Sequence, residues 1–200
     1  MRRVSVFGAT GSVGQNTIDL IARSPEEYDV VALTGAANID QLAKDAIKLN
    51  ADSSRIVLMG HSAGCHLATL ATLADAARPV RALICNDTRA YDIPFLARIS
   101  GGGLPSLYVP AFRDHDMWKA WSPISYTGLK QQPPTMVAWS GGTRRDVVSM
   151  RFADTLERDG GKVTRFDGSR NYNHFSINRK IGAERDGLTR RIDRFLETVL

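Results

Sequence analysis

The feature that most constrains the fold is a regular alternation of short apolar strands and amphipathic helices. Strands are expected at residues 4–7, 30–34, 55–59, 80–85, 135–139 and 162–166. Helical spacing of apolar residues appears between most of them, at residues 12–25, 40–49, 65–77, 148–158 and 187–199. Alternation of this kind builds a mainly parallel sheet with helices on both faces. The sequence therefore predicts an α/β fold, a three-layer α/β/α sandwich.

Length and composition favour one globular domain. A chain of 200 residues with 43% hydrophobic and 24% charged residues suits a single α/β domain and excludes a disordered or fibrous chain. No apolar run approaches the roughly 20 residues that span a bilayer, and only VSVF separates Arg3 from Gly8, so no secretory signal is expected. We expect a cytoplasmic protein without a membrane partner. Cys65 and Cys85 lack metal-ligand spacing and are expected in the core.

Charge is unevenly distributed along the chain. The net charge is +5, of which residues 1–52 carry −2 and residues 53–200 carry +7. The basic side chains near the C-terminus alternate with acidic ones and with apolar residues at helical spacing. This pattern favours a solvated helix face over a nucleic-acid surface. We therefore expect a small-molecule substrate as partner, and the change in charge near residue 52 suggests two segments of different character.

The sharpest chemical motif is Gly60-His61-Ser62-Ala63-Gly64, which lies between an expected strand and an expected helix. A G-x-S-x-G sequence in that context predicts a nucleophile elbow, in which a serine occupies a strained turn and the glycines let strand and helix approach closely. The alternative is an ordinary strand–helix turn that contains a serine. In the elbow, the amide of Ala63 at the helix N-terminus would provide half of an oxyanion hole.

A serine nucleophile needs a base that works near neutral pH, and the chain has four histidines. His61 and His66 flank the motif and are expected to pack or to face solvent, and His115 lies in an irregular region. His174 follows the last expected strand, where the order serine, acid, histidine puts the base. We predict His174 as the base, with a surface histidine as the alternative.

The acid is harder to assign from the sequence. It is expected after the strand at 135–139, where Asp146 is the single carboxylate of the following loop. Asp146 comes late in that loop and could instead cap the next helix. Asp167, just past the last strand, is the reserve. The sequence therefore predicts a triad of Ser62, His174 and Asp146.

Residues 86–132 form an irregular, lid-like insertion with little periodicity. It contains seven aromatic residues: Tyr91, Phe95, Tyr108, Phe112, Trp118, Trp121 and Tyr126. Two interpretations stay open. The rings line an apolar substrate pocket, or they anchor the insertion on the core.

A second motif follows the first expected strand, where three glycines have G-x-x-G-x-x-G spacing. A glycine-rich turn at a helix N-terminus can hold a pyrophosphate on backbone amides. The residues concerned are Gly8, Thr10, Gly11, Ser12, Val13 and Gly14. No acidic residue follows the second strand to bind a ribose 2′-hydroxyl, which favours NADP or no cofactor at all.

The motifs resemble two different families. From residue 53 onward the sequences SRIVLMGHSAGCHLA, SPIS, PPTMVAWSGG and NHFSI resemble the α/β-hydrolase superfamily, especially small esterases of the arylformamidase, or kynurenine formamidase-like, kind. From residue 1 to about 52, RRVSVFGATGSVGQNTIDLI and VVALTGAANIDQLAKDAIKLNAD resemble the N-terminal NADP-binding part of 1-deoxy-D-xylulose 5-phosphate reductoisomerase. Both resemblances meet near Ala51-Asp52. We therefore interpret the chain as a chimera of the two families.

Each resemblance is incomplete. The hydrolase half would lack the upstream loop that gives its family the second oxyanion donor, and the reductoisomerase half would lack its metal-binding and catalytic domains. Ala37 stands where the reductoisomerase family has a basic residue for the 2′-phosphate of NADP. The β-α-β-α of residues 1–52 would replace the missing hydrolase elements and give the strand order 2-1-3-4-5-6, flavodoxin-like. That order would put Thr10 and Gly11 beside Ser62 as the second oxyanion donors.

Three functions follow from these motifs. The leading one is a serine hydrolase that acts on a small ester or activated amide and needs no cofactor. The second is a Rossmann-type module that binds NADP or phosphate. The third is a recombined domain that folds without activity, because each inherited site lacks its partner half.

Overall fold

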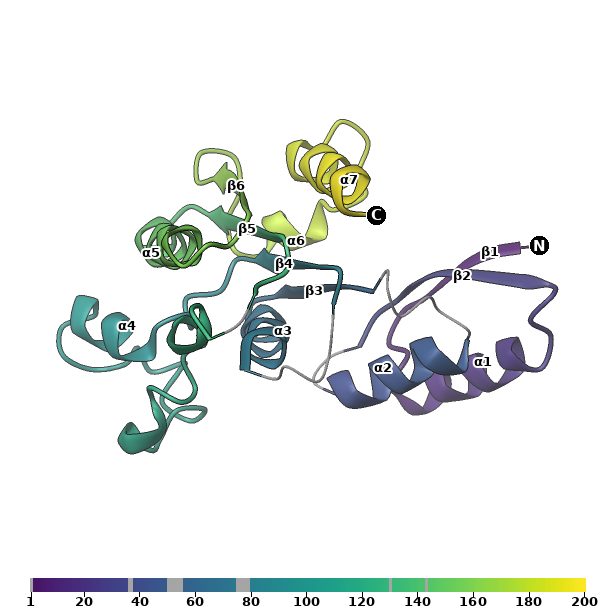
Figure 1. Ribbon diagram of the computed structural model, residues 1–200, viewed down its shortest axis with the longest axis horizontal. Helices are drawn as coiled ribbons and strands as arrows, with labels where there is room; N and C mark the ends of the chain where they lie inside the picture. Colours follow the sequence, from purple (N-terminus) through teal and green to yellow (C-terminus); the bar gives the residue numbers. More distant parts are fainter. Residues whose placement is uncertain (1, 36–37, 50–55, 75–79, 130, 143) are drawn as a thin grey trace. The chain divides into compact units, whose positions relative to one another are not determined.

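The computed structural model describes residues 2–35, 38–49, 56–74, 80–129, 131–142 and 144–200. The chain forms two compact units, Met1–Ile56 and Val57–Leu200 (Figure 1). The expected seam at Ala51-Asp52 lies outside the described residues. The expectation that residues 1–200 form a single domain, with segments 1–52 and 53–200, stays a prediction.

The first unit has the expected β-α-β-α order. Strands β1 (Arg2–Val6) and β2 (Tyr28–Leu33) pair in parallel, and helices α1 (Ser12–Ala22) and α2 (Ile39–Lys48) cover one face of the pair. The buried apolar side chains lie between the strands and the helices. Residues that recur every three to four positions share one face of a helix, and here the apolar face is turned to the strands. They are Val6, Ala9, Ile18 and Ile21.

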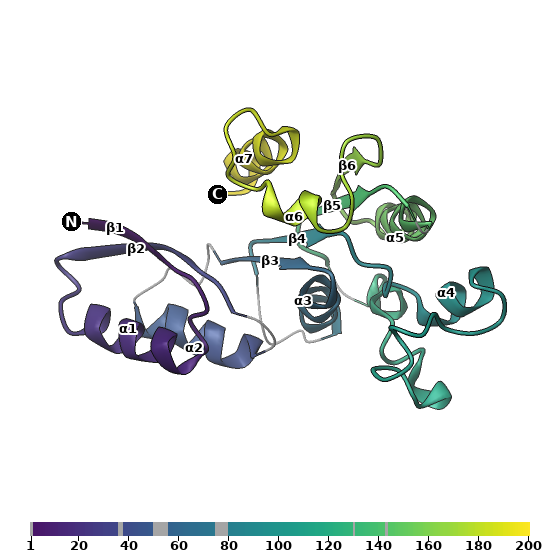
Figure 2. The same cartoon turned by 180° about the vertical axis from the view of Figure 1, so that it is seen from behind.

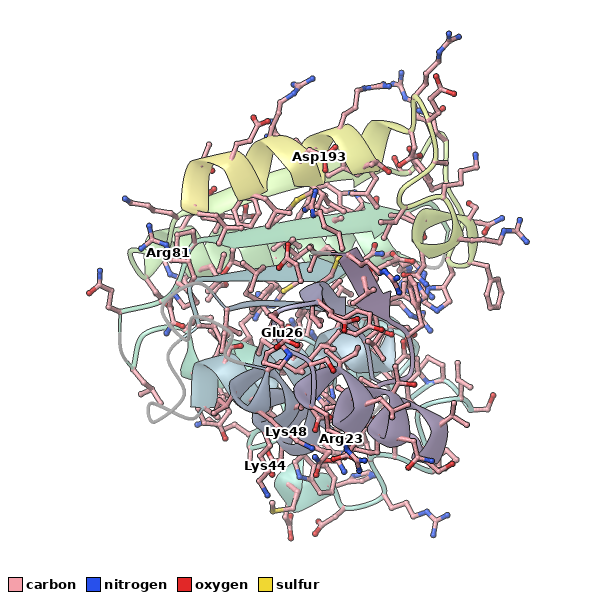
Figure 3. The ribbon with its side chains drawn as sticks, turned by 90° about the vertical axis from the view of Figure 1, so that its right-hand side faces the viewer. Arg23, Glu26, Lys44, Lys48, Arg81 and Asp193 are labelled. Carbon is pink, nitrogen blue, oxygen red and sulfur yellow. The ribbon has the colours of Figure 1, made fainter. Side chains whose placement is uncertain are left out.

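An ion-pair cluster joins the two helices of this unit. Asp19 of α1 pairs with Arg23 one turn later and accepts a hydrogen bond from Lys48 of α2 at 3.2 Å. Figure 3 labels Arg23, Lys44 and Lys48 on this part of the chain. These side chains are largely exposed and solvent screens their charges, so the cluster contributes little to stability.

The second unit contains a four-stranded parallel sheet in the order β3-β4-β5-β6. Its strands are β3 (Val57–His61), β4 (Ala82–Asn86), β5 (Thr135–Ser140) and β6 (Val163–Gly168). His61 pairs with Asn86, and Ser140 pairs with Gly168. The carboxyl ends of neighbouring strands therefore meet at one edge of the sheet, where ligands of open α/β sheets bind.

Helices cover both faces of this sheet (Figures 1 and 2). Helices α3 (Ala63–Ala74) and α5 (Arg145–Arg158) lie on one face, around Leu83, Val137 and Phe152. Helices α6 (Ser176–Arg179) and α7 (Gly187–Val199) lie on the other, around Ile84, Met136 and Ile192. Alternate residues of β4 and β5 face opposite layers, which explains why both strands are continuously apolar.

The insertion between β4 and β5 is more ordered than its sequence suggests. It contains helix α4 (Ile93–Ile99) and two 3-10 turns, η2 (His115–Met117) and η3 (Pro123–Tyr126). A separate apolar cluster holds it together, with Ile93 and Phe112 buried and Trp118 and Trp121 packed against them. Tyr91 is fully buried and stacks on Phe152 of α5 at 4.1 Å, so this ring anchors the insertion on the core.

The three-layer α/β class with parallel sheets is confirmed. The predicted strand order 2-1-3-4-5-6 matches the structure in part. Strand β1 pairs with β2, and β3, β4, β5 and β6 are adjacent in that order, as predicted. Among the described residues the two groups of strands form two sheets, and β1 does not pair with β3. Strand β4 ends at Asn86, one residue later than expected, and α3 begins at Ala63, two residues earlier. Both shifts fall at the edge where the predicted serine lies. None of the helices in the described ranges is long and apolar enough to cross a bilayer.

Candidate functional site

Ser62 occupies the turn between β3 and α3 with a positive φ of 56°. This left-handed conformation is costly for a residue with a side chain and is typical of functional turns. The amide of Ser62 donates to Asn86 O at 3.0 Å, and its carbonyl accepts from the amide of His66 at 3.1 Å. Ala63 opens the helix, so its amide belongs to the first turn, where backbone donors lack partners within the helix. The turn has the geometry predicted for a nucleophile elbow.

The glycines of the motif differ in what they permit. A Cβ on Gly60 would lie 2.2 Å from Gly64 O and 2.5 Å from the amide nitrogen of Cys65, so strand and helix approach more closely there than any side chain allows. A Cβ on Gly64 would meet nothing within 4 Å. The close approach that the motif predicts therefore depends on Gly60.

His174 lies in the loop after β6 and bonds a buried carboxylate. Its Nδ1 is 2.8 Å from Asp87 Oδ2; the histidine side chain is 24% exposed and the aspartate side chain 0%. A carboxylate accepts only, so Nδ1 carries the proton and Nε2 is left as the acceptor. This is the tautomer that a general base needs.

Asp87 follows β4 directly and also has a positive φ, of 60°. Its Oδ1 accepts from the amide of Ser140 at 2.9 Å, and its Oδ2 accepts from the Ser140 hydroxyl at 2.7 Å. The Nη1 atom of Arg145 lies 3.6 Å from Oδ2 and donates to Asp87 O at 3.0 Å. Three donors, namely the amide and hydroxyl of Ser140 and Nδ1–H of His174, therefore hold this carboxylate, and together with the nearby charge of Arg145 they compensate for its burial.

The expectation that Asp146 orients His174 is wrong. Asp146 lies exposed in the first turn of α5, and the carboxylate at His174 belongs to Asp87. The reserve candidate, Asp167, is also exposed and accepts from the amide of Ser169 at 2.9 Å. Ser140 at the end of β5 and Arg145 at the start of α5, on either side of that loop, hold Asp87. The missed signal was an aspartate one residue beyond a buried strand that neighbours the nucleophile strand.

The other histidines have separate surroundings. His66 is buried, and its Nε2 lies 2.8 Å from Trp121 O, which ties α3 to the insertion; burial lowers the pKa of His66. His115 packs against Trp118, with ring centroids 4.2 Å apart and an angle of 33° between the planes. The packing role expected for His66 fits this position.

His61, Asp87 and His174 also form a candidate metal-ligand set, with one donor atom of each within 4.8 Å of the others. His174 Nδ1 and Asp87 Oδ2 already share a hydrogen bond, and a cation bound to those two atoms would displace the proton on Nδ1. The guanidinium of Arg145 lies 3.6 Å from Asp87 Oδ2, and its positive charge disfavours a cation at this carboxylate. Both observations disfavour a metal ion at these three residues.

A cavity of about 330 Å³ lies between the insertion and α5. Asp92, Lys119 and Arg151 are among its lining residues, and none of its lining residues belongs to the set around His174. Asp92 and Arg151 form an ion pair across it at 3.0 Å. The cavity is therefore separate from the residues with catalytic chemistry.

The glycine-rich turn of the first unit has features that suit a phosphate. Gly8 has a φ of 68°, and a Cβ on Gly14 would lie 2.2 Å from Gly8 O, so the helix starts directly against the strand end. The N-cap residue of α1, Gly11, provides no side-chain cap, which leaves the first backbone amides available to an anion. Ala37 lies outside the described residues. The two units are described separately, so the proximity of Thr10 and Gly11 to Ser62 stays a prediction.

Comparison with known sequences finds likeness near the N-terminus. The sequence model of the 1-deoxy-D-xylulose 5-phosphate reductoisomerase family matches residues 4–70, less than half of the chain. The reductoisomerase of Jannaschia sp. (strain CCS1) is 80% identical over 50 residues, which are 25% of this chain and 13% of that protein. The enzyme of Ruegeria pomeroyi is 73% identical over 52 residues, 26% of this chain and again 13% of the relative. The chain thus spans only a small part of these relatives.

Comparison with solved structures finds esterases. A structure titled as an arylesterase matches with a TM-score of 0.63 and 20% identity, covering 99% of this chain and 75% of the other. The carboxylesterase EstE1, cloned from a metagenomic library, matches with a TM-score of 0.61 and 17% identity, covering 100% of this chain and 81% of the other. At such identities the likeness concerns the fold alone. A reductoisomerase-like beginning and an esterase-like fold therefore occur in one chain.

Proposed function

We propose that the chain is a serine hydrolase acting on a small ester or activated amide. The observation that carries the proposal is the pair of His174 and a fully buried Asp87, at the same sheet edge as Ser62 on its strained turn. In this reaction the Ser62 hydroxyl attacks the substrate carbonyl while His174 Nε2 takes its proton. The imidazolium, stabilised by Asp87, then protonates the leaving group, and water repeats the sequence on the acyl-enzyme.

The oxyanion of the tetrahedral intermediate would bind the amide of Ala63 at the start of α3. Thr10 and Gly11 are proposed as the source of a second donor. Loss of one oxyanion donor costs about a hundredfold to a thousandfold in kcat, so a missing second donor would leave a slow enzyme whose serine is still activated. An arylformamide is the finer substrate class, proposed from the resemblance of the second segment to arylformamidases.

The test uses a fluorophosphonate probe and p-nitrophenyl acetate on the full chain. We expect the probe to label the wild type, and labelling to drop sharply in Ser62→Ala and His174→Ala. His115→Ala is the matched control, because the ring of His115 packs against Trp118 in the insertion. Equal labelling of the wild type and both site variants would refute the triad. An N-formyl arylamine compared with p-nitrophenyl acetate tests the substrate class.

A second function is supported by the uncapped N-terminus of α1 and its glycine turn. Gly8 and Gly11 to Gly14 would hold a phosphate of NADP on backbone amides, and the cofactor would supply hydride chemistry. Binding at a hundredfold excess over Kd stabilises the fold by about 2.7 kcal/mol, which a thermal melt detects. No shift with NADP or phosphate would reject this function, and Ala37→Arg tests whether the missing basic residue is the reason.

The chimeric origin is the third proposal. It is supported by strong identity to reductoisomerases over 50 residues beside an esterase-like fold. A recombined domain without activity would unfold cooperatively yet show neither labelling nor a ligand-dependent shift. Labelling of Ser62 would reject that inactive form.

A further inference from the structure

His61 connects the nucleophile turn to the loop of the base. It is the last residue of β3, directly before Ser62, and its Nε2 lies 2.9 Å from His174 O. Strands β3 and β6 lie at opposite edges of the four-stranded sheet, so no ladder hydrogen bond joins them. The bond from His61 is therefore a direct link between the two segments that must bring Ser62 and His174 together.

The loop of His174 has other supports, which act on neighbouring residues. The Asn173 side chain accepts from the amides of Phe175 at 3.1 Å and Ser176 at 2.9 Å. The amide of Gly141, beyond β5, donates to Tyr172 O at 3.0 Å. These bonds shape the loop and tie it to β5. The contact from His61 reaches the main chain of His174 itself.

The same contact brings two imidazole rings together. Their centroids are 4.7 Å apart, with an angle of 31° between the planes. A carbonyl accepts only, so His61 Nε2 carries a proton in both charge states of the ring. Protonation of His61 therefore leaves the tether intact and adds a positive charge beside the ring that must become an imidazolium.

We propose that His61 is a positioning residue that fixes the main chain of His174 and must be neutral for His174 to accept the proton of Ser62. This inference rests on the proposed hydrolase function and deepens it. It predicts two separable effects of His61, one of geometry and one of charge.

The surroundings of His61 favour the neutral ring. Burial is the largest influence and lowers its pKa; the hydrogen bond to the His174 carbonyl raises it. The charged groups that act on His61 are His174 and Arg145, which lower the pKa, and Asp87, which raises it. The pKa of His61 lies below the usual 6.5. The charge effect should therefore appear only on the acid side of pH 6.5.

Two substitutions separate the effects. His61→Gln keeps an N–H donor that can reach the carbonyl and cannot ionise, whereas His61→Leu removes donor and charge together. At pH 8 we expect the fluorophosphonate labelling rate of His61→Gln to stay within about threefold of wild type and that of His61→Leu to fall about tenfold, the worth of one hydrogen bond. As the pH falls below 6.5, the rate of His61→Gln relative to wild type should rise over the range in which 15N NMR shows that His61 of wild type becomes charged, because only wild type acquires the second charge.

His66→Gln is the matched control. His66 also bonds a carbonyl through Nε2 and also has a pKa lowered by burial, but its partner is Trp121 in the insertion. Its rate relative to wild type should not change with pH in this range. Thermal melts of all variants establish that the labelled proteins are folded, and 15N NMR of the imidazoles checks that Nε2 of His61 is protonated.

The outcomes are distinct. Wild type that is not labelled refutes the hydrolase function and this inference with it. If wild type is labelled and folded His61→Leu is labelled at the same rate, the positioning role of His61 is refuted while the hydrolase function stands. A rate of His61→Gln relative to wild type that stays flat over the pH range in which 15N NMR shows His61 of wild type becoming charged refutes the requirement for a neutral ring, as does a parallel rise in His66→Gln.

Discussion

Replacement of Asp87 by asparagine tests the assignment of the acid. The amide of Ser140 donates to Oδ1, so the asparagine must keep its oxygen there and put its nitrogen in place of Oδ2. That nitrogen would face His174 Nδ1–H, and two donors cannot bond. His174 would then hold its proton on Nε2 and lose the ability to take a proton from Ser62.

The magnitude follows from this change of tautomer. Loss of a triad acid in this way costs about 10⁴ in kcat, which corresponds to roughly 5.4 kcal/mol at 1.36 kcal/mol per tenfold. The substitution also removes the charge next to Arg145, whose side chain is only 10% exposed. Breaking a buried ion pair costs about 3 kcal/mol of stability. A typical domain has 5–15 kcal/mol, so the variant should fold at low temperature with a reduced Tm.

The assay compares Asp87→Asn with Asp146→Asn, because Asp146 is an exposed aspartate in the first turn of α5, whereas the carboxylate bonded to His174 belongs to Asp87. Labelling by fluorophosphonate and hydrolysis of p-nitrophenyl acetate are measured at 10 °C, after circular dichroism confirms folding. We expect Asp146→Asn to stay within about twofold of wild type. The reasoning would be refuted by a folded Asp87→Asn whose labelling and hydrolysis rates lie within tenfold of wild type, or by a thousandfold loss of these rates in Asp146→Asn.

Three further predictions concern the supports of the site and of the fold. Ser140→Ala removes the hydroxyl donor to Asp87 and should slow labelling about tenfold; an unchanged rate would contradict this support. Burial raises the pKa of Asp186, but its hydrogen bonds lower that pKa overall, so the stabilisation of α7 by Asp186 is present above pH 3.8 and is lost as the pH falls through the folded pKa. Asp186→Ala should therefore lower the free energy of unfolding by about 1 kcal/mol at pH 7 in a urea titration, and this difference from wild type should disappear in acid. Gly60→Ala should cost about 3 kcal/mol and Gly64→Ala almost nothing, and equal melts of the two would contradict the close approach at Gly60.

The strained turn at Ser62 and the position of His174 after the last strand could be predicted because their signals are local. A strand, a glycine, a serine and a helix follow one another within 18 residues, and His174 follows the last strand. The structure adds the left-handed φ of Ser62 and shows that, of the two glycines in the serine motif, Gly60 meets a steric limit and Gly64 does not. The contact between His61 and His174 spans 113 residues, and no spacing in the sequence indicates it.

The acid was missed because the end of β4 was expected one residue early. With the strand ending at Cys85, Asn86 and Asp87 fell into the insertion, whereas the ladder continues to Asn86. The position of Asp87 beside His174 depends on the adjacency of β4, β5 and β6, which single-strand patterns do not contain. The rule that carboxyl ends of adjacent parallel strands share an edge would have placed Asp87 near Ser62.

The strain at Ser62 leads to a last prediction. Ser62 and Asp87, which both lie at the carboxyl edge of the sheet, have left-handed backbone conformations. Ser62 and Asp87 have φ values of 56° and 60°, and each amide donates to the neighbouring strand, to Asn86 O at 3.0 Å and Ala138 O at 2.9 Å. The ladder therefore holds conformations that cost about 1–3 kcal/mol each. Ser62→Gly and Ser62→Ala both remove the nucleophile, but only glycine adopts this φ without strain. We expect Ser62→Gly to unfold with a free energy about 1 kcal/mol above that of Ser62→Ala in urea titrations. Equal or reversed stabilities would mean that the turn is not strained, and the elbow would lose its physical basis.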